Sequence, residues 1–545
     1  MGLLGVLTVL LAFTFAALAI DTGRLWVARQ DMQHAADMAA LAAARHNGCG
    51  TDLAEARERA MTSAQQFGVD ASKPGASLTV TRGHLVNAVV GGANSQVFVP
   101  DGEPSDTTNA AKVVLKKTVR KSLLMGGFAG QTIELSATAT AQGEAPKATM
   151  SVGTRFGITQ KQADFIAKLF SGILGNSSLN LTAGSLENLA SAVINLEALR
   201  MAAGAASIDD LLSREVTVTE LLRWISVAGT NIDAAGQQAL KDIISASSSK
   251  GSLTVRVGTI FNVQVPAPAG VATANINVLD LVTAGLQIGG KDQLISLNAA
   301  VSNAAFVTIK LLGLPKIAIG PKGQNIRGAW CTQAQMATMD VAVGVDLKTP
   351  SILGFEMSSD LVLHLLLGGA TGHLTDLLAD ASGGSASVQT NSTLLSLSLK
   401  DTPGTGPGYV ALKTLLSSKP VKLTVLQTFD VVESKGRVMQ VNIPAPVRKN
   451  MPQRDVRGTD LSDAIKTAVK TGKLDISIEN GGLLGALLNP VVDLVTSLVS
   501  SVLNALIVPL VADVIAPLLE IMGIGGTGVS VEITDIVAPQ PILKI

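Results

Sequence analysis

The feature that most constrains this chain is an uncharged apolar run at residues 2–20, which continues without a break into a second helical stretch. A bilayer core needs roughly 20 consecutive apolar residues in a helix, and this run supplies about 19. We therefore predict a membrane-spanning helix. Its predicted anchoring side chains are the large apolar ones within and just beyond the run, namely Leu3, Leu10, Phe13, Phe15, Leu18, Ile20 and Trp26.

After residue 20 the pattern changes from apolar to amphipathic. Small and apolar residues recur at steps of three, four and seven, while charged and amide side chains fall between them. The recurring residues are Leu25, Met32, Ala36, Ala39 and Ala43. The spacing predicts one continuous helix, in which residues 1–47 form a transmembrane anchor and a narrow, alanine-lined stalk.

Three interpretations of the apolar run compete. Ala17, Leu18 and Ala19 resemble the cleavage site of a signal peptide, but no basic residue precedes the run and the helical pattern continues past that site. The run could also be a buried helix of a soluble protein. The third interpretation is an uncleaved membrane anchor, and the length of the run favours it. By the positive-inside rule, the arginines after the run would place the body in the cytoplasm. Because the run starts abruptly, we expect further basic residues upstream of it.

Length and composition narrow the function classes. At 545 residues the chain is long enough for three or four domains, and its 42 basic residues balance 42 acidic ones. This balance predicts no nucleic-acid partner. The two cysteines, Cys49 and Cys331, form either one disulfide, worth on the order of 4–5 kcal/mol, or two separate thiols. Nothing in the sequence shows that they meet.

Periodicity divides the rest of the chain into segments of an α+β fold. A helix followed by about four alternating strands predicts a small α+β module over residues 48–146. Helical spacing, including one long helix at 185–203, predicts a helical region over 147–250. Alternating segments rich in Val, Thr and Ser predict a β-rich antiparallel body over 251–480.

The last segment, residues 481–545, predicts apolar helices followed by a terminal strand. Residues 494–512 carry no charge, so length alone permits a second membrane span. Pro490, Pro509 and Pro517 interrupt the apolar segment and favour short helices that pack on the β-rich body or lie against the membrane. Both possibilities remain open at this point.

Three motifs along the stalk carry a family resemblance. They are DTGRL at residues 21–25, RQDMQ at 29–33 and AADMAALA at 35–42. Together they resemble the TadE/TadG-like signature of TadG-like proteins, which belong to the tight-adherence (Flp) pilus machinery of bacteria. The resemblance implies a single-pass anchor in the bacterial inner membrane and a body in the periplasm. It also implies partners among other pilus-assembly and envelope proteins, with an unknown oligomeric state.

No pattern in the chain predicts catalysis, a metal or a cofactor. Some relatives carry a von Willebrand factor A domain with a metal-binding Asp-x-Ser-x-Ser motif, but residues 380–384 lack the last Ser and predict a turn. Residues 285–292 approach a phosphate-binding loop without its Ser or Thr, and we predict an ordinary loop. His364 lies in an apolar run and is predicted to be a core or hydrogen-bonded residue, whereas His34 belongs on the outer face of the stalk.

These observations predict a non-enzymatic, membrane-anchored envelope protein that serves as a structural or accessory component of Flp-type pilus assembly. The alternative is an envelope module that binds lipid or another apolar ligand through its C-terminal helices. Small stalk residues permit close approach of a partner helix, and substitution of Ala36 and Ala40 by Leu is expected to disturb association without unfolding the body. The predicted partner-binding residues are Arg24, Arg29, Gln33, Ala36, Asp37 and Ala40.

Overall fold

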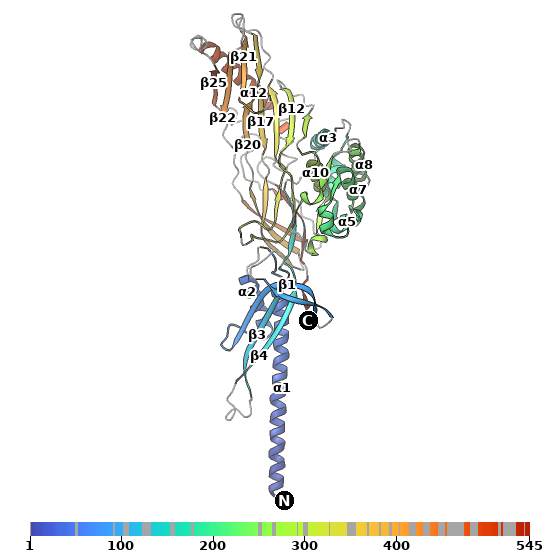
Figure 1. The fold of residues 1–545 in the computed structure, drawn as a ribbon, viewed down its shortest axis with the longest axis vertical. Coiled ribbons are helices and arrows are strands. Elements are labelled where there is room, and N and C mark those ends of the chain that lie inside the picture. The colour runs from blue at the N-terminus through green and yellow to red at the C-terminus, as the bar shows by residue number, and fades with distance from the viewer. Residues whose placement is uncertain are drawn as a thin grey trace. The chain divides into compact units, whose positions relative to one another are not determined.

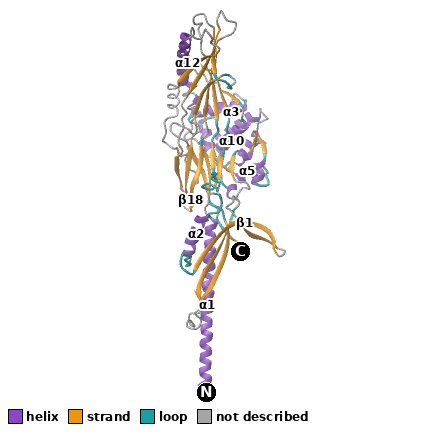
Figure 2. Ribbon diagram, turned by 60° about the vertical axis from the view of Figure 1, so that its left-hand side comes forward, coloured by secondary structure: helices purple, strands orange, loops and turns teal. Residues whose placement is uncertain are grey.

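The computed structural model of the chain confirms the α+β class, with one long helix at the amino terminus (Figures 1 and 2). Its residues form two compact units. Unit 1 comprises Met1–Lys147, Pro321–Cys331 and Val537–Ile545, and unit 2 comprises Ala148–Gly320 and Thr332–Ile536. The structure describes residues 2–49, 53–90, 93–101, 108–121, 132–152, 159–175, 179–248, 253–263, 269–291, 293–297, 304–325, 327–345, 356–367, 370–380, 383–391, 395–402, 404–413, 421–428, 437–444, 453–454, 473–479, 489–510, 514–515, 530–538 and 540–544.

Unit 1 is built on two helices, α1 (Gly2–Ala44) and α2 (Leu53–Gln66). The helix α1 is continuous, as predicted, because no proline interrupts it. Its second half packs against α2 through small side chains, which allow the two helix backbones to approach closely. The fully buried alanines of the core cluster that the two helices share with the sheet are Ala35, Ala36, Ala39, Ala40, Ala43 and Ala44 of α1 and Ala60 and Ala64 of α2.

A five-stranded sheet completes unit 1, in the order β2-β1-β3-β4-β27. The strand pairs are antiparallel, and Val80, Val113 and Ala139 stand side by side across β1, β3 and β4. Alternate residues of these strands point into the core and the others toward solvent, as in an antiparallel sheet covered on one face. The strands are β1 (Ala76–Val90), β2 (Ala93–Pro100), β3 (Ala110–Arg120), β4 (Thr132–Gln142) and β27 (Ile542–Lys544).

The first part of unit 2 is helical, and side-chain caps define several of its helix starts. Thr159, Thr182 and Thr217 each form a capping box with the residue three positions later. The helices are α3 (Gln160–Leu174), α4 (Ala183–Ser191), α5 (Leu196–Ala202), α6 (Ile208–Ser213), α7 (Val218–Ala228), α8 (Ala234–Ser248), the 3-10 helix η1 (Val257–Thr259), α9 (Ala269–Ala272) and α10 (Val278–Gly289).

Two predictions for this region were wrong. The single helix predicted at 185–203 is split into α4 and α5 by the short strand β6 (Val193–Asn195), because Asn195 turns the chain and caps α5. The loop predicted at 285–292 is helical as far as Gly289, since Asn277 caps α10 and its apolar side chains are buried. A helix end in this position does not form the strand–loop–helix arrangement of a phosphate-binding loop.

Among the described residues, unit 2 contains four larger sheets and two two-stranded ones. They are β11-β12-β15-β17-β20, β24-β26-β5-β13-β9, β14-β18-β19-β23, β16-β21-β22-β25, β10-β6 and β7-β8. Most pairs are antiparallel, as predicted, and β13 with β9 is a parallel exception. The second and third sheets share a buried core that includes Met150, Leu374, Val388, Val531 and Ile533.

The remaining strands belong to these sheets. They are β5 (Lys147–Val152), β7 (Glu215–Thr217), β8 (Thr254–Arg256), β9 (Phe261–Val263), β10 (Asn275–Asn277), β11 (Leu294–Leu297), β12 (Ala304–Leu311), β13 (Ile317–Gly320), β14 (Gln333–Gln335), β15 (Met339–Val345), β16 (Glu356–Asp360), β17 (Val362–Leu367), β18 (Thr371–Asp380), β19 (Gly383–Asn391), β20 (Leu395–Lys400), β21 (Gly408–Lys413), β22 (Val421–Thr428), β23 (Arg437–Pro444), β24 (Gln453–Arg454), β25 (Lys473–Glu479) and β26 (Ser530–Val537).

The C-terminal apolar segment forms the helix α12 (Asn489–Leu510). It contacts β15 and β25 within unit 2, so it packs on the β-rich body. One stripe of the helix is buried, whereas Leu494 is 38% exposed. The buried residues of the stripe are Val495, Val499, Leu503, Leu506 and Leu510. Residues 511–513, which belong to the predicted span at 494–512, lie outside the described part of the chain.

Candidate functional site

The candidate site of this protein is the helix α1 together with the sheet that covers its second half. Within the described residues, α1 is the one helix long and apolar enough to cross a membrane. The side chains of the apolar run that the structure describes are mostly exposed: Phe13 is 72% exposed and Ile20 is 57% exposed. An exposed apolar helix of this length fits a bilayer and not water.

The structure places the predicted anchoring residues on this exposed part of α1. Phe13, Phe15, Leu18 and Ile20 are exposed, and so is Trp26 at 61%. Trp26 follows the apolar run by six residues, where an indole ring suits the interface between hydrocarbon and water. The side chains of Leu3 and Leu10 lie outside those that the structure describes.

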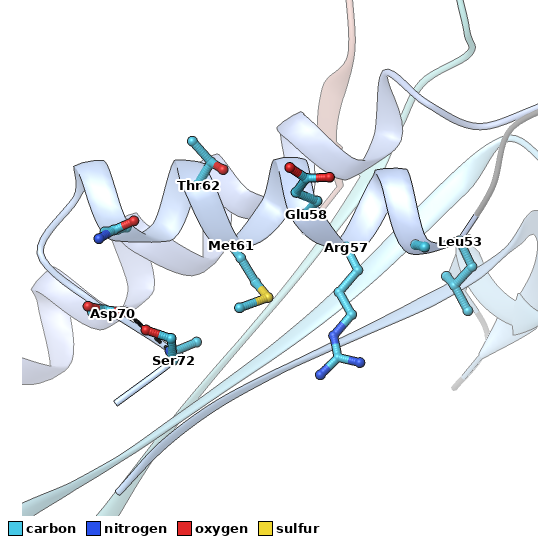
Figure 3. A pocket seen from close by; sticks show the side chains of 10 residues that line it. Leu53, Arg57, Glu58, Met61, Thr62, Asp70 and Ser72 are labelled. Carbon is cyan, nitrogen blue, oxygen red and sulfur yellow. Dashed lines mark hydrogen bonds between the residues drawn. The ribbon is translucent and has the colours of Figure 1, made fainter. Parts of the chain in front are cut away.

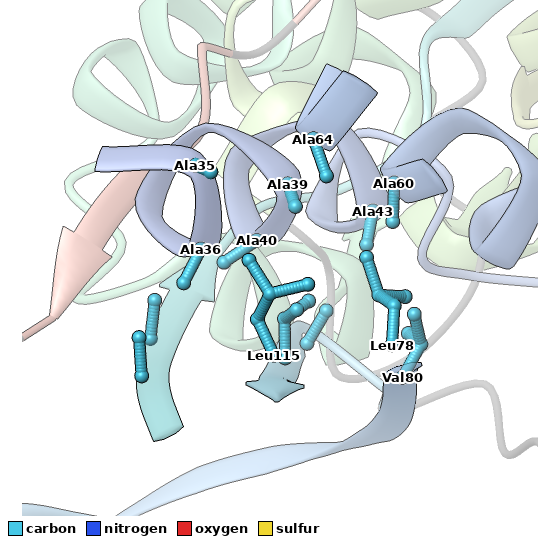
Figure 4. Packing of buried hydrophobic residues seen from close by; sticks show 14 of the residues in the cluster. Ala35, Ala36, Ala39, Ala40, Ala43, Ala60, Ala64, Leu78, Val80 and Leu115 are labelled. Carbon is cyan, nitrogen blue, oxygen red and sulfur yellow. The ribbon is translucent and has the colours of Figure 1, made fainter. Parts of the chain in front are cut away.

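The stalk alanines predicted to bind a partner are buried in the protein itself. Ala36 and Ala40 are 0% exposed and pack in the cluster that includes Leu78 of β1 and Leu115 of β3 (Figure 4). A side chain without solvent exposure is not available to a second protein. The prediction that these two residues form a partner surface was therefore wrong, because the sheet of unit 1 already occupies this face of the helix.

Two further residues of the predicted surface bind the same sheet. Arg24 Nη2 donates a hydrogen bond to the carbonyl oxygen of Arg120, at the end of β3. Gln33 Nε2 donates to the carbonyl oxygen of Thr138 on β4 at 3.1 Å and to Asp37 Oδ1 at 2.8 Å. These bonds align α1 with the strands. Arg29, another of the six residues predicted to bind a partner, is exposed. Among the described residues, its side chain forms no hydrogen bond to the sheet.

A disulfide lies just after the C-terminal end of α1. Of the two possibilities that the sequence left open, the structure shows the disulfide: Cys49 is bonded to Cys331, and their Cα atoms lie 5.7 Å apart although 282 residues separate them. Cys331 ends the segment Pro321–Cys331, which belongs to unit 1 although the residues on both sides of it belong to unit 2. The disulfide therefore holds an inserted segment of the chain to the residues that follow α1.

Charged groups accompany the disulfide. Glu55 Oε1 lies 3.6 Å from His46 Nδ1 and 3.7 Å from Lys322 Nζ, so one carboxylate joins the stalk end, α2 and the inserted segment. Burial lowers the pKa of His46 below its usual range, and the Glu55 carboxylate opposes that effect. The arrangement stabilises a junction, and it presents no nucleophile next to a base.

A second polar cluster lies between β1 and the segment that follows β2. His84 Nδ1 is 2.7 Å from Asp101 Oδ1, and the Thr108 hydroxyl donates to the other oxygen of the same carboxylate. A catalytic triad requires the hydroxyl to contact the imidazole. Here the Asp101 carboxylate lies between the His84 imidazole and the Thr108 hydroxyl. The cluster therefore holds the segment after β2 against β1. Sequence reasoning missed it because the three residues are spread over 25 positions of the chain.

A groove of about 610 Å³ runs beside α2, between the helix and residues 70–72 (Figure 3). Asp70 Oδ1 accepts hydrogen bonds from the backbone and the hydroxyl of Ser72, and these bonds lower the pKa of Asp70. Arg57 and Glu58 stand on the helix side. In a site for a small substrate, several polar groups point toward the same position. The polar groups that line this groove do not.

The remaining histidine and metal predictions concern single residues. His364 lies 3.0 Å from Asp340 Oδ2, which confirms a hydrogen-bonded role, and His34 is exposed on the stalk as predicted. Asp380 and Gly383 pair at the end of the hairpin β18–β19, while Ala381 and Ser382 lie outside the described residues. Among the described residues, no three His, Cys, Asp or Glu side chains cluster in a way that suits a metal ion.

Two protein-family models match the amino-terminal part of the chain. The family described as "Putative Flp pilus-assembly TadE/G-like" matches residues 1–46, and the family described as "Putative Tad-like Flp pilus-assembly" matches residues 27–141. The matches cover α1, α2, β1 to β3 and nearly all of β4. Among curated proteins and among solved structures, nothing matches the chain.

Proposed function

We propose that this chain, a TadG-like protein related to Flp pilus assembly, is a single-pass anchored structural component whose body lies in the periplasm. One observation carries the proposal. The described side chains in the apolar half of α1 are mostly exposed, and its second half forms part of the core of unit 1. A single helix therefore joins the bilayer to unit 1, and unit 1 cannot swing freely at the point where the chain leaves the membrane.

The disulfide supports the periplasmic side for the body. Disulfides persist in oxidising compartments such as the bacterial periplasm and are rare in the cytosol. The pair Cys49–Cys331 lies on the body side of the apolar run. We give this argument more weight than the positive-inside rule, because a disulfide depends directly on the compartment in which the body folds.

Partner contact on the stalk is proposed for its exposed face and not for its alanines. Val27, Asp31, His34 and Met38 follow one another at steps of four, three and four, and all four are exposed. Arg29, which belonged to the predicted surface, flanks this face. A neighbouring membrane-anchored protein of the pilus machinery would reach these residues without disturbing unit 1.

The alternative, a lipid- or apolar-ligand-binding module, receives no support from α12. Its apolar stripe is buried against strands of unit 2. Leu494 is exposed on the same helix, but one exposed side chain does not make a binding site for an apolar ligand.

Topology and cross-linking test the proposal together. The full chain carrying a periplasm-active reporter after Ile545 should be active, and the same chain with a cytoplasm-active reporter should be silent. A photo-reactive residue in place of His34 should cross-link to pilus-assembly proteins, whereas one in place of Ser77, exposed on β1, should not. A cytoplasmic report would exclude the periplasmic body. Equal cross-linking from both positions would exclude the stalk face as the binding surface.

A further inference from the structure

We infer that the end of β3 contacts the anionic phospholipid headgroups of the membrane that holds α1. The surface concerned, here called the cationic tip, consists of Lys117, Arg120 and Lys121, with Arg24 of α1 beside it. The inference rests on the proposed membrane anchoring and adds to it a second, electrostatic contact between protein and bilayer.

One hydrogen bond determines where the cationic tip lies along the axis of α1, relative to the end of the apolar run. Arg24 Nη2 donates to the carbonyl oxygen of Arg120, so the end of β3 lies beside Arg24. Arg24 follows Ile20 by four residues, which is about 6 Å along the helix axis at roughly 1.5 Å per residue. The headgroup layer extends about 5–7 Å beyond the hydrocarbon core on each side. Arg120 and Lys121 therefore lie at headgroup level. Lys117 lies three residues earlier in β3, about 10 Å along the strand at roughly 3.3 Å per residue, which is about one Debye length. Figure 1 shows β3 and β4 running alongside α1.

The charges of the cationic tip are available to a ligand. Arg120 and Lys121 are exposed and Lys117 is half-buried. In the part of the chain that the structure describes, none of these three side chains forms an ion pair. Lys116 differs from them because its Nζ lies 2.9 Å from Glu134 Oε1. Asp21, one turn before Arg24 on the same helix, is the nearest acidic residue along α1 and already has a polar contact.

The chemistry of this surface suits a headgroup better than a protein partner. The outward residues of β4 next to the tip are Thr132, Glu134 and Ser136, which are polar and exposed and offer no apolar pocket for an anchoring side chain. Lysine and arginine bind phosphate through charge and through several N–H donors. Basic side chains within a few ångströms of an anionic leaflet are attracted to it, and the attraction is weakened by salt.

Fluorescence of Trp26 reports directly on the lipids around this point, because Trp26 lies within one helical turn of Arg24. The full chain with Trp224→Phe and Trp330→Phe, reconstituted in phosphatidylcholine–phosphatidylglycerol vesicles, would contain Trp26 as its single tryptophan. Its quenching by spin-labelled phosphatidylglycerol is compared with that by spin-labelled phosphatidylcholine at equal content. We expect about two- to fivefold stronger quenching by the anionic lipid, and less at high salt.

Matched variants identify the residues responsible. Lys117→Gln, Arg120→Gln and Lys121→Gln together should bring the quenching ratio close to one. Arg57→Gln, Arg59→Gln and Lys112→Gln remove the same charge from α2 and from a part of β3 farther from the membrane, and they should leave the ratio unchanged.

The charge-preserving variant Lys117→Arg, Arg120→Lys and Lys121→Arg should also keep the ratio, which separates loss of charge from misfolding. A ratio that survives the three glutamine substitutions, or a ratio of one in the starting protein, would overturn the inference while leaving the anchor intact. Absence of quenching by either labelled lipid would instead contradict the membrane anchoring itself.

Discussion

Gln33 and Thr138 are 105 residues apart in the chain, yet the side-chain amide of Gln33 donates to the Thr138 carbonyl oxygen across 3.1 Å. The terminal strand β27 pairs with β4 only at Thr140–Gln142, so α1 supplies a donor to β4 just before that pairing begins. The stalk is therefore a structural part of the sheet domain and not a free rod beside it.

Substitution of Ala40 by Leu tests this role of the stalk. The extra side chain enters a cluster where Ala40 is 0% exposed, so we expect unit 1 to lose about 1–3 kcal/mol of stability through overpacking. Unfolding in urea, followed by the fluorescence of Trp330, measures the loss. Gln30→Leu on the exposed face of α1 serves as the control and should change stability by less than about 0.5 kcal/mol. An unchanged midpoint for Ala40→Leu would mean that this face is not packed in solution.

Reduction of the disulfide should weaken unit 1 alone. Cross-linking of residues that are 282 positions apart restricts the unfolded chain, and its loss typically costs about 2–4 kcal/mol. We expect dithiothreitol to lower the melting temperature of the natural chain. The variant Cys49→Ala, Cys331→Ala should already melt at the lower temperature and should not respond to the reductant, because the chain has no other cysteine.

Stability of unit 2 should fall as the pH drops below about 6.5, through His373. Burial lowers the pKa of this side chain in the folded protein, so the unfolded chain binds more protons than the folded one in this window. Protonation therefore favours unfolding, and the contribution of neutral His373 is fully present above about pH 6.5. Unfolding curves at pH 7.5 and 5.5 should diverge less for His373→Gln than for the natural chain. An equal divergence would exclude His373 as a source of the pH dependence.

Packing of α12 on the β-rich body predicts a large effect of a buried residue and a small effect of an exposed one. Leu503 is 2% exposed, so Leu503→Ala should destabilise unit 2 by about 2–5 kcal/mol. Leu494→Ala, at a residue that is 38% exposed on the same helix, should cost less than about 1 kcal/mol. The fluorescence of Trp224 follows the unfolding of unit 2. Equal effects of the two substitutions would argue against the packed position of α12.

Removal of residues 2–20 should release the chain from membranes. Among the described helices, α1 is the one that can span a bilayer by length and composition. We expect the shortened chain to remain in the supernatant after sedimentation of membranes, whereas the full chain resists extraction at alkaline pH. Sedimentation of the shortened chain with membranes would indicate a second attachment, and residues 494–512 would be the first place to search for it.

Local patterns predicted elements well where a single segment carries its own signals. Apolar spacing predicted the helical region over residues 147–250, and α3 (Gln160–Leu174) lies within it. The short strand β6 and the helix α10 were missed, because three-residue strands have no readable period and a 12-residue apolar helix resembles a buried strand. The long apolar helix α1 was predictable for the same reason as α3, while the hydrogen bonds of Arg24 and Gln33 to strand carbonyls depend on residues about a hundred positions away.

The sequence by itself determined the long helix α1, its apolar half and its stripe of alanines, because helix formation and membrane insertion depend on side chains within a few turns of one another. Only the tertiary structure decided what covers the alanine stripe. Small side chains permit close approach by a partner helix and by the protein's own sheet alike, and the strands that meet Ala36 and Ala40 lie far along the chain. The pairing of Cys49 with Cys331 was decided in the same way, since long-range packing brings their Cα atoms to 5.7 Å.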